Sequence, residues 1–131
     1  MRVETLVVGP LQTNAYVLLD ESSGKAAVVD PGASGLHISD AISAAGATLK
    51  YILTTHGHAD HTGGAFDLHN KSGGEYVVGD GDRGQIETPS ASLVATIPGF
   101  VNPPGIDRPV TGREILELGE SRVIVIATPG H

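Results

Sequence analysis

Potential metal ligands are concentrated in one stretch of this sequence, Thr55-His56-Gly57-His58-Ala59-Asp60-His61-Thr62-Gly63-Gly64. His56 and His58 are two positions apart, so an extended segment that leaves a strand directs both imidazoles to the same side. Asp60 and His61 follow where the chain is expected to turn into a helix, and they can present a second face. Four potential metal ligands therefore lie within a very short segment.

Each of these residues also has an ordinary explanation. A single histidine is usually a surface or core residue, and Asp60 ahead of Thr62-Gly63 fits the N-cap of a helix. Three histidines and an aspartate this close together are harder to explain by packing, because neighbouring imidazoles repel one another when they are protonated. We therefore predict a metal site. The chain has no cysteine, so its ligands are imidazole and carboxylate, which suit zinc, iron or manganese.

The bulk composition limits the kind of protein that surrounds this site. The 131 residues suffice for one compact domain but not for two. The net charge of -7 repels nucleic acid and anionic lipid, and the eight Lys and Arg residues are scattered. A small-molecule substrate is therefore expected, with no nucleic-acid or membrane partner. The lack of cysteine and of a targeting segment predicts a cytoplasmic protein.

The segments around the histidine cluster alternate between strand and helix patterns. Strands are expected at residues 3–8, 14–19, 26–29, 51–53, 76–78, 115–118 and 123–127. Apolar residues recur with helical spacing from Ile38 to Ala45, a second short helix is expected at 64–70, and five prolines predict irregular structure from Thr88 to Pro109. The first three strands are expected to form an antiparallel meander. The whole pattern indicates an α/β (α+β) domain with helices packed on a sheet.

Four motifs, in order along the chain, resemble those of one family. Thr55–Gly64 resembles the signature loop of the metallo-β-lactamase superfamily. Val28-Val29-Asp30-Pro31-Gly32 resembles its earlier aspartate motif, and Thr128-Pro129-Gly130-His131 resembles the motif that supplies the next metal-binding histidine. Gly9-Pro10-Leu11-Gln12-Thr13-Asn14 is similar to the opening of the small glyoxalase II-like (hydroxyacylglutathione hydrolase-like) members.

The resemblance implies a set of site residues. His56, His58 and His131 would hold one metal ion. Asp60 and His61 would begin a second site, with Asp60 serving in catalysis as well as in metal binding. Asp30 would act in catalysis from behind the ligands by orienting the loop, although an aspartate before a proline is equally typical of a turn. The implied cofactor is zinc, as one or two ions, with iron or manganese as alternatives.

The resemblance also implies a four-layer αββα sandwich built from two similar halves. The family pattern continues to a bridging aspartate and a final histidine, which are absent here. Residues 1–131 are therefore expected to form a single metallo-β-lactamase-type domain, the N-terminal portion of the fold, incomplete at its C-terminus and with most of the second half missing. The inner sheet face would then need another cover, for which a homo-oligomer is one candidate.

The implied activity is hydrolysis of a thioester such as S-acyl glutathione by a metal-bound hydroxide. Zinc lowers the pKa of bound water from about 15.7 to about 7, and a leaving thiolate needs little protonation. Within the superfamily the alternatives are a mononuclear iron persulfide dioxygenase, a lactonase and a β-lactamase, because three histidines do not distinguish zinc from iron. A non-catalytic metal-binding half-domain is the alternative outside the enzymes.

Overall fold

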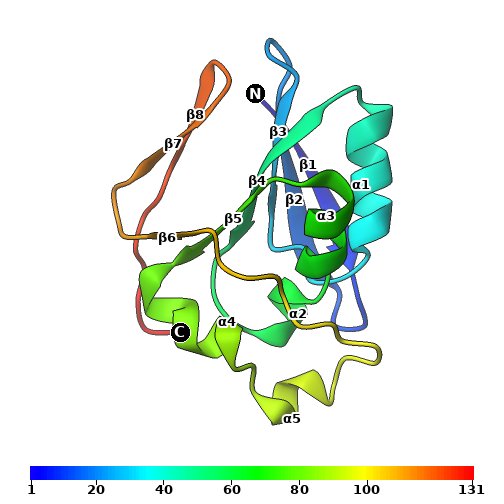
Figure 1. Cartoon of the computed structure of the whole chain (residues 1–131), viewed down its shortest axis with the longest axis vertical. Coiled ribbons are helices and arrows are strands. Elements are labelled where there is room, and N and C mark those ends of the chain that lie inside the picture. Colours follow the sequence, from blue (N-terminus) through cyan, green and yellow to red (C-terminus); the bar gives the residue numbers. More distant parts are fainter.

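A computed structural model of the protein describes all of residues 1–131, and its central feature is a six-stranded mixed sheet (Figure 1). The strands, in spatial as well as chain order, are β1 (Arg2–Val8), β2 (Thr13–Asp20), β3 (Lys25–Val29), β4 (Thr48–Thr54), β5 (Glu75–Gly79) and β6 (Arg108–Val110). The strands β1, β2 and β3 pair antiparallel, which confirms the expected meander, whereas β3 to β6 pair parallel. The parallel strands bring their carboxyl ends to one edge of the sheet.

Two helices connect the parallel strands and cover one face of the sheet. Helix α1 (Gly35–Ala44) lies between β3 and β4, and α3 (Ala65–Ser72) lies between β4 and β5. The helical spacing of Ile38 and Ile42 turns both side chains inward, where 0% and 4% of their surface is exposed. After α1 the chain reverses at Gly46, whose φ of 68° is the left-handed conformation that glycine adopts without strain.

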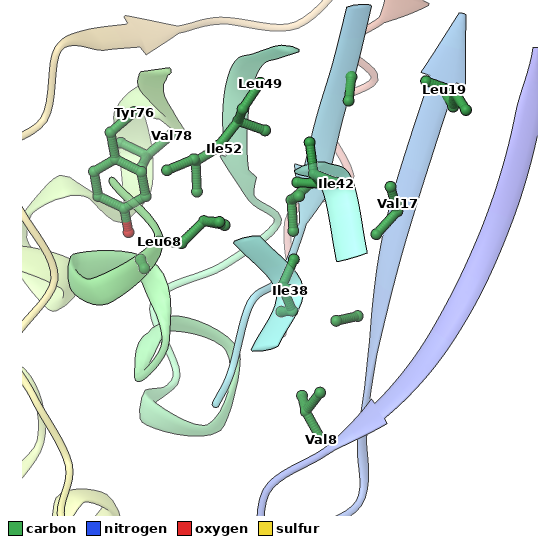
Figure 2. Close-up of a cluster of buried hydrophobic side chains, with 14 of the residues drawn as sticks. Val8, Val17, Leu19, Ile38, Ile42, Leu49, Ile52, Leu68, Tyr76 and Val78 are labelled. Atoms are coloured by element: carbon green, nitrogen blue, oxygen red, sulfur yellow. The ribbon is translucent and has the colours of Figure 1, made fainter. Parts of the chain in front are cut away.

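Side chains of successive strand residues alternate between two apolar clusters. Ile38, Ile42 and Leu68 from the helices pack with Val28 and Ile52 of the sheet in the larger cluster (Figure 2). Each fully buried side chain of this size contributes roughly 1.5–3 kcal/mol relative to leaving it exposed. Along β3, β4 and β5, residues next to members of this cluster point to the opposite face and enter a second cluster, to which Ala27, Tyr51 and Val77 belong. The central strands β3, β4 and β5 are therefore buried on both faces.

A two-stranded antiparallel sheet covers the second face. It consists of β7 (Ile115–Leu118) and β8 (Ser121–Ile124), and Leu116 and Leu118 insert into the second cluster. The layers are thus helices, the main sheet and the beginning of another sheet, which confirms the expected α/β class. Figure 1 shows no helix outside the β7–β8 pair, so these residues form three layers of the αββα sandwich.

The segment between β5 and β7 is more regular than expected. It contains the 3-10 helix η1 (Asp80–Asp82), the helices α4 (Arg83–Glu87) and α5 (Ala91–Val94), and the strand β6. The prediction of irregular structure from Thr88 to Pro109 was therefore wrong at α5 and at β6. Pro109 is tolerated in β6 because β6 pairs only with β5, at the edge of the sheet.

The position of the last strand was also predicted imperfectly. β8 ends at Ile124 and begins at Ser121, two residues before the expected start. Its length is set by the four residues of its partner β7, with Leu118 opposite Ser121 and Ile115 opposite Ile124.

None of the helices of this protein could span a membrane.

Candidate metal centre

The histidine cluster lies at the carboxyl ends of β3 and β4. Asp30 directly follows β3, and Thr55 and His56 directly follow β4, whose last residue is Thr54. Parallel strands place the residues that follow them side by side, and this edge is where ligands of open α/β sheets bind. From His56 the loop continues into the short helix α2 (Ala59–Thr62).

Glycines allow the histidine loop to lie directly against the turn after β3. A Cβ atom on Gly32 would lie 1.7 Å from the carbonyl oxygen of Asp60, so only glycine fits at this position. The backbone N–H of Gly64 donates a hydrogen bond to the carbonyl of Pro31 at 2.7 Å. The two motifs, well separated in the sequence, therefore form one compact backbone unit.

Three imidazoles converge beside this unit. The ring centroids of His56 and His58 are 4.7 Å apart, and the centroid of His131 lies 4.7 Å from that of His56 and 4.9 Å from that of His58. One nitrogen of each ring lies within 4.8 Å of the corresponding nitrogens of the other two. The structure thus brings His131 to the pair His56 and His58 near the middle of the chain. Its imidazole is exposed, whereas the other two are half-buried.

A chain of hydrogen bonds sets the orientation of His56. Both carboxylate oxygens of Asp30 accept hydrogen bonds from Thr55, one from its backbone N–H and one from its hydroxyl, each at 2.7 Å. A hydroxyl has a single hydrogen, so the oxygen of Thr55 is left to accept from Nδ1–H of His56 at 2.9 Å. This network assigns the proton of His56 to Nδ1 and leaves Nε2 with a free lone pair.

The Nε2 atom of His56 is the feature that best fits a metal ion. It is buried and has no hydrogen-bond partner in the protein, a situation that is costly for a polar atom. Burial, followed by repulsion from His61, lowers the pKa of His56, which favours the neutral ring that metals bind. Metal-binding histidines commonly donate their other ring N–H to a neighbouring group. The donor set of three imidazoles is therefore suited to a divalent metal ion.

His61 contacts both Asp30 and His56. His61 donates from Nδ1 to Asp30 at 3.0 Å, and this hydrogen bond raises the pKa of His61. Its ring also lies close to that of His56, with centroids 4.2 Å apart. Nitrogens of His56 and His61 and an oxygen of Asp30 form a second group of converging ligand atoms. Since Asp30 already accepts three hydrogen bonds, it is better placed to orient its neighbours than to bind an ion.

Asp60 lies beside these two groups rather than within either of them. Its Oδ2 atom is 3.4 Å from Nε2 of His61 and accepts a hydrogen bond from Thr13 at 2.8 Å. The N-cap of α2 is His58 and has no side-chain capping bond. The alternative explanation of Asp60 as a helix N-cap is therefore wrong, because Asp60 occupies the first turn instead.

Several contacts of the site were not predicted from the sequence. The hydroxyl of Thr13 donates to Asp60, and that of Thr55 donates to Asp30. Asp82 accepts a hydrogen bond from the backbone N–H of Gly57 at 3.3 Å. Thr13 lies in the Gly9–Asn14 motif and Thr55 in the Thr55–Gly64 motif, and this position is the signal from which their roles could have been found. The remaining histidines lie elsewhere: His37 is exposed on α1, and His69 faces Asp107 at 3.4 Å.

The geometry agrees with what the chain resembles among known proteins. A hydroxyacylglutathione hydrolase of Methylococcus capsulatus is 32% identical over 130 residues, which are 98% of this chain and 44% of that protein. Among solved structures, the BLEG-1 B3 metallo-beta-lactamase matches with a TM-score of 0.85 and 26% identity, covering 98% of this chain and 62% of that one. A di-iron-bound form of TTHA1623 matches with a TM-score of 0.74 and 26% identity, covering 86% and 56%.

The match extends over nearly the whole chain but not over the whole of its relatives. The chain spans 44% and 62% of the length of the hydrolase and of the BLEG-1 structure. The family profile described as the metallo-beta-lactamase superfamily matches residues 8–131. This range contains the aspartate turn, the histidine loop and His131, which the fold assembles into one site. The chain therefore belongs to the metallo-beta-lactamase superfamily.

Proposed function

We propose that the protein is a metal-dependent hydrolase of thioesters such as S-acyl glutathione. The observation that carries this proposal is the convergence of His56, His58 and His131, with the buried Nε2 of His56 left without a partner. The choice of a thioester is supported by the likeness to the Methylococcus hydroxyacylglutathione hydrolase. Since the chain spans less than half of that relative, the activity of the whole enzyme is part of the proposal.

The residues of the site have distinct roles in this proposal. His56, His58 and His131 hold a divalent ion, and Asp60 with His61 contributes to a second one. When bound, such an ion supplies a Lewis acid for the acyl carbonyl and lowers the pKa of water. Asp30 and Thr55 keep the imidazole of His56 in the required tautomer and orientation through their hydrogen bonds.

The metal is proposed to be zinc, as one or two ions. Imidazole and carboxylate ligands suit zinc, and three histidines with one open position form a common catalytic zinc site. The same ligands also suit iron, and the related TTHA1623 structure is described as di-iron-bound. Metal analysis of protein purified without added metal, compared with protein loaded with each metal, tests this part of the proposal.

A second candidate activity is hydrolysis of β-lactams. It is favoured by the likeness to BLEG-1, whose TM-score of 0.85 covers 98% of this chain. Both reactions transfer an acyl group to water, so the three-histidine site serves either one. The difference lies in what binds beside the metal, and substrate comparison on the same preparation separates the two.

The deciding experiment is a substrate panel on the metal-loaded chain. We expect hydrolysis of S-lactoylglutathione to exceed that of a chromogenic cephalosporin, to be abolished in His58→Ala and to persist in His37→Ala, a histidine exposed on α1. Oxygen consumption on glutathione persulfide, measured with the iron-loaded protein, tests the alternative of an iron persulfide dioxygenase. A metal-loaded wild-type chain that hydrolyses neither S-lactoylglutathione nor the cephalosporin would contradict the proposed function.

A further inference from the structure

The carboxylate of Asp60 is connected to a strand that lies far from it in the sequence. The hydroxyl of Thr13, the first residue of β2, donates a hydrogen bond of 2.8 Å to Oδ2 of Asp60. Thr13 is buried, with 7% of its surface exposed. The direction of the bond is unambiguous, because a carboxylate only accepts and the hydroxyl has a hydrogen to give.

Thr13 is itself held firmly. It pairs with Val8 of β1 at the end of a tight hairpin, in which the backbone N–H of Gln12 donates to the carbonyl of Gly9 at 3.2 Å. Its cross-strand partner Val8 and Ala15, two residues further along β2, belong to the larger apolar cluster. A β-branched side chain also has few χ1 rotamers. The hydroxyl of Thr13 therefore has a defined position relative to the sheet.

Asp60, in contrast, has little else to restrain its side chain. It lies in a helix of four residues, and its side chain is 24% exposed. The terminal torsion of an aspartate is broad, so the plane of the carboxylate is set by its contacts. The hydrogen bond from Thr13 engages Oδ2, the same oxygen that lies 3.4 Å from Nε2 of His61. It thereby keeps the carboxylate next to His61.

We propose that Thr13 is a positioning residue, which holds the carboxylate of Asp60 in place to bind a second divalent cation beside His61. This inference rests on the proposed function, in which Asp60 and His61 contribute to that second ion. Residues that hydrogen-bond to metal ligands affect metal affinity by about 10- to 100-fold when they are replaced. The side-chain hydrogen bond of Thr13 goes to Asp60 and not to the three-histidine group, so metal binding by that group is expected to be independent of Thr13.

Cobalt(II) titration of the metal-free chain tests the inference. Binding is followed by visible absorption and by calorimetry in wild type, Thr13→Val, Thr13→Ala and Thr13→Ser. We expect two binding steps in wild type. The valine and alanine variants keep the first step and weaken the second by about 10- to 100-fold, whereas serine, which retains the hydroxyl, restores it. Thr5→Val, on the exposed side of β1, is the matched control and keeps both steps.

The outcomes separate this inference from the proposed function. Metal-free melting temperatures identify any variant that fails to fold, and the two hydroxyl-free variants differ in size, so the comparison survives the loss of one. An unchanged second step in Thr13→Val, an equal weakening of both steps, or a single step in wild type would each overturn the inference. If the two-step pattern holds but the loaded wild type hydrolyses no substrate, the proposed function fails while the inference stands.

Discussion

The carboxylate of Asp20 accepts a hydrogen bond from the backbone N–H of Glu120 at 3.0 Å, although 100 positions separate the two residues. Asp20 ends β2, and Glu120 lies in the turn between β7 and β8. The hydroxyls of Ser23 and Ser121 donate to the same carboxylate. Gly119 lies so close that an added Cβ atom would be 2.3 Å from Oδ2 of Asp20. This carboxylate therefore attaches the β7–β8 sheet, and the segment leading to His131, to the main sheet.

The first prediction concerns the pH dependence of this attachment. The hydrogen bond from Ser23, followed by those from Glu120 and Ser121, lowers the pKa of Asp20 from 3.8 to about 2. A lowered pKa in the folded state stabilises the protein above the unfolded pKa, and this stabilisation disappears as the pH falls through the folded pKa. We expect Asp20→Asn to lower the melting temperature at pH 7.

The same variant has a characteristic pH signature. The difference in melting temperature between Asp20→Asn and wild type should shrink as the pH falls from about 3.8 toward about 2. Asp40→Asn, at an exposed position of α1, is the control and should change stability little at any pH. A constant difference between wild type and Asp20→Asn across this range would show that the charge of Asp20 does not stabilise the hairpin.

The second prediction concerns the contact between the aspartate turn and the histidine loop. Gly32→Ala places a Cβ atom 1.7 Å from the carbonyl oxygen of Asp60, and the backbone must move to relieve the overlap. Overpacking of this kind costs typically about 1–3 kcal/mol. We expect a loss of unfolding free energy in urea together with weaker metal binding. Gly84→Ala, in α4 with no atom near the added methyl, should be neutral or slightly stabilising.

The third prediction tests the three-histidine group as a metal site. Zinc that binds only the folded state should raise wild-type stability by about 2.7 kcal/mol at a free concentration 100 times its Kd. We expect His58→Ala to lose this stabilisation, because its imidazole is one of the three converging rings. His37→Ala should retain it. Full zinc stoichiometry by elemental analysis of His58→Ala would overturn the assignment of this ligand.

The fourth prediction concerns the hydrogen bond that orients His56. Thr55→Val removes the hydroxyl that accepts from Nδ1–H of His56 and donates to Asp30, while the backbone bond from position 55 to Asp30 remains. We expect affinity for the first metal ion to fall by about 10- to 100-fold, measured by competition with a chromophoric chelator. Thr55→Ser should recover it. Equal affinities for all three proteins would mean that the imidazole is held by other contacts.

Much of the fold and of the candidate site could be predicted from local patterns. The helical spacing of Ile38 and Ile42 predicted α1, and stretches rich in strand-forming residues, separated by turn residues, predicted the first strands. The histidine loop after β4 was recognisable from residue types alone. The proline-rich segment was predicted less well, because pairing with β5 makes a strand of Arg108–Val110 that has no period of its own.

The sequence alone determined which ligands exist and on which local segments they lie, since ligand chemistry and strand or helix periodicity are properties of neighbouring residues. Only the tertiary structure decided that His131 meets His56, because this depends on how Asp20 attaches the β7–β8 hairpin. It also decided that Thr13 contacts Asp60 and that Thr55 assigns the tautomer of His56. Short hydroxyl side chains leave no periodic signal, and their partners are chosen only when the packed sheet brings distant backbone together.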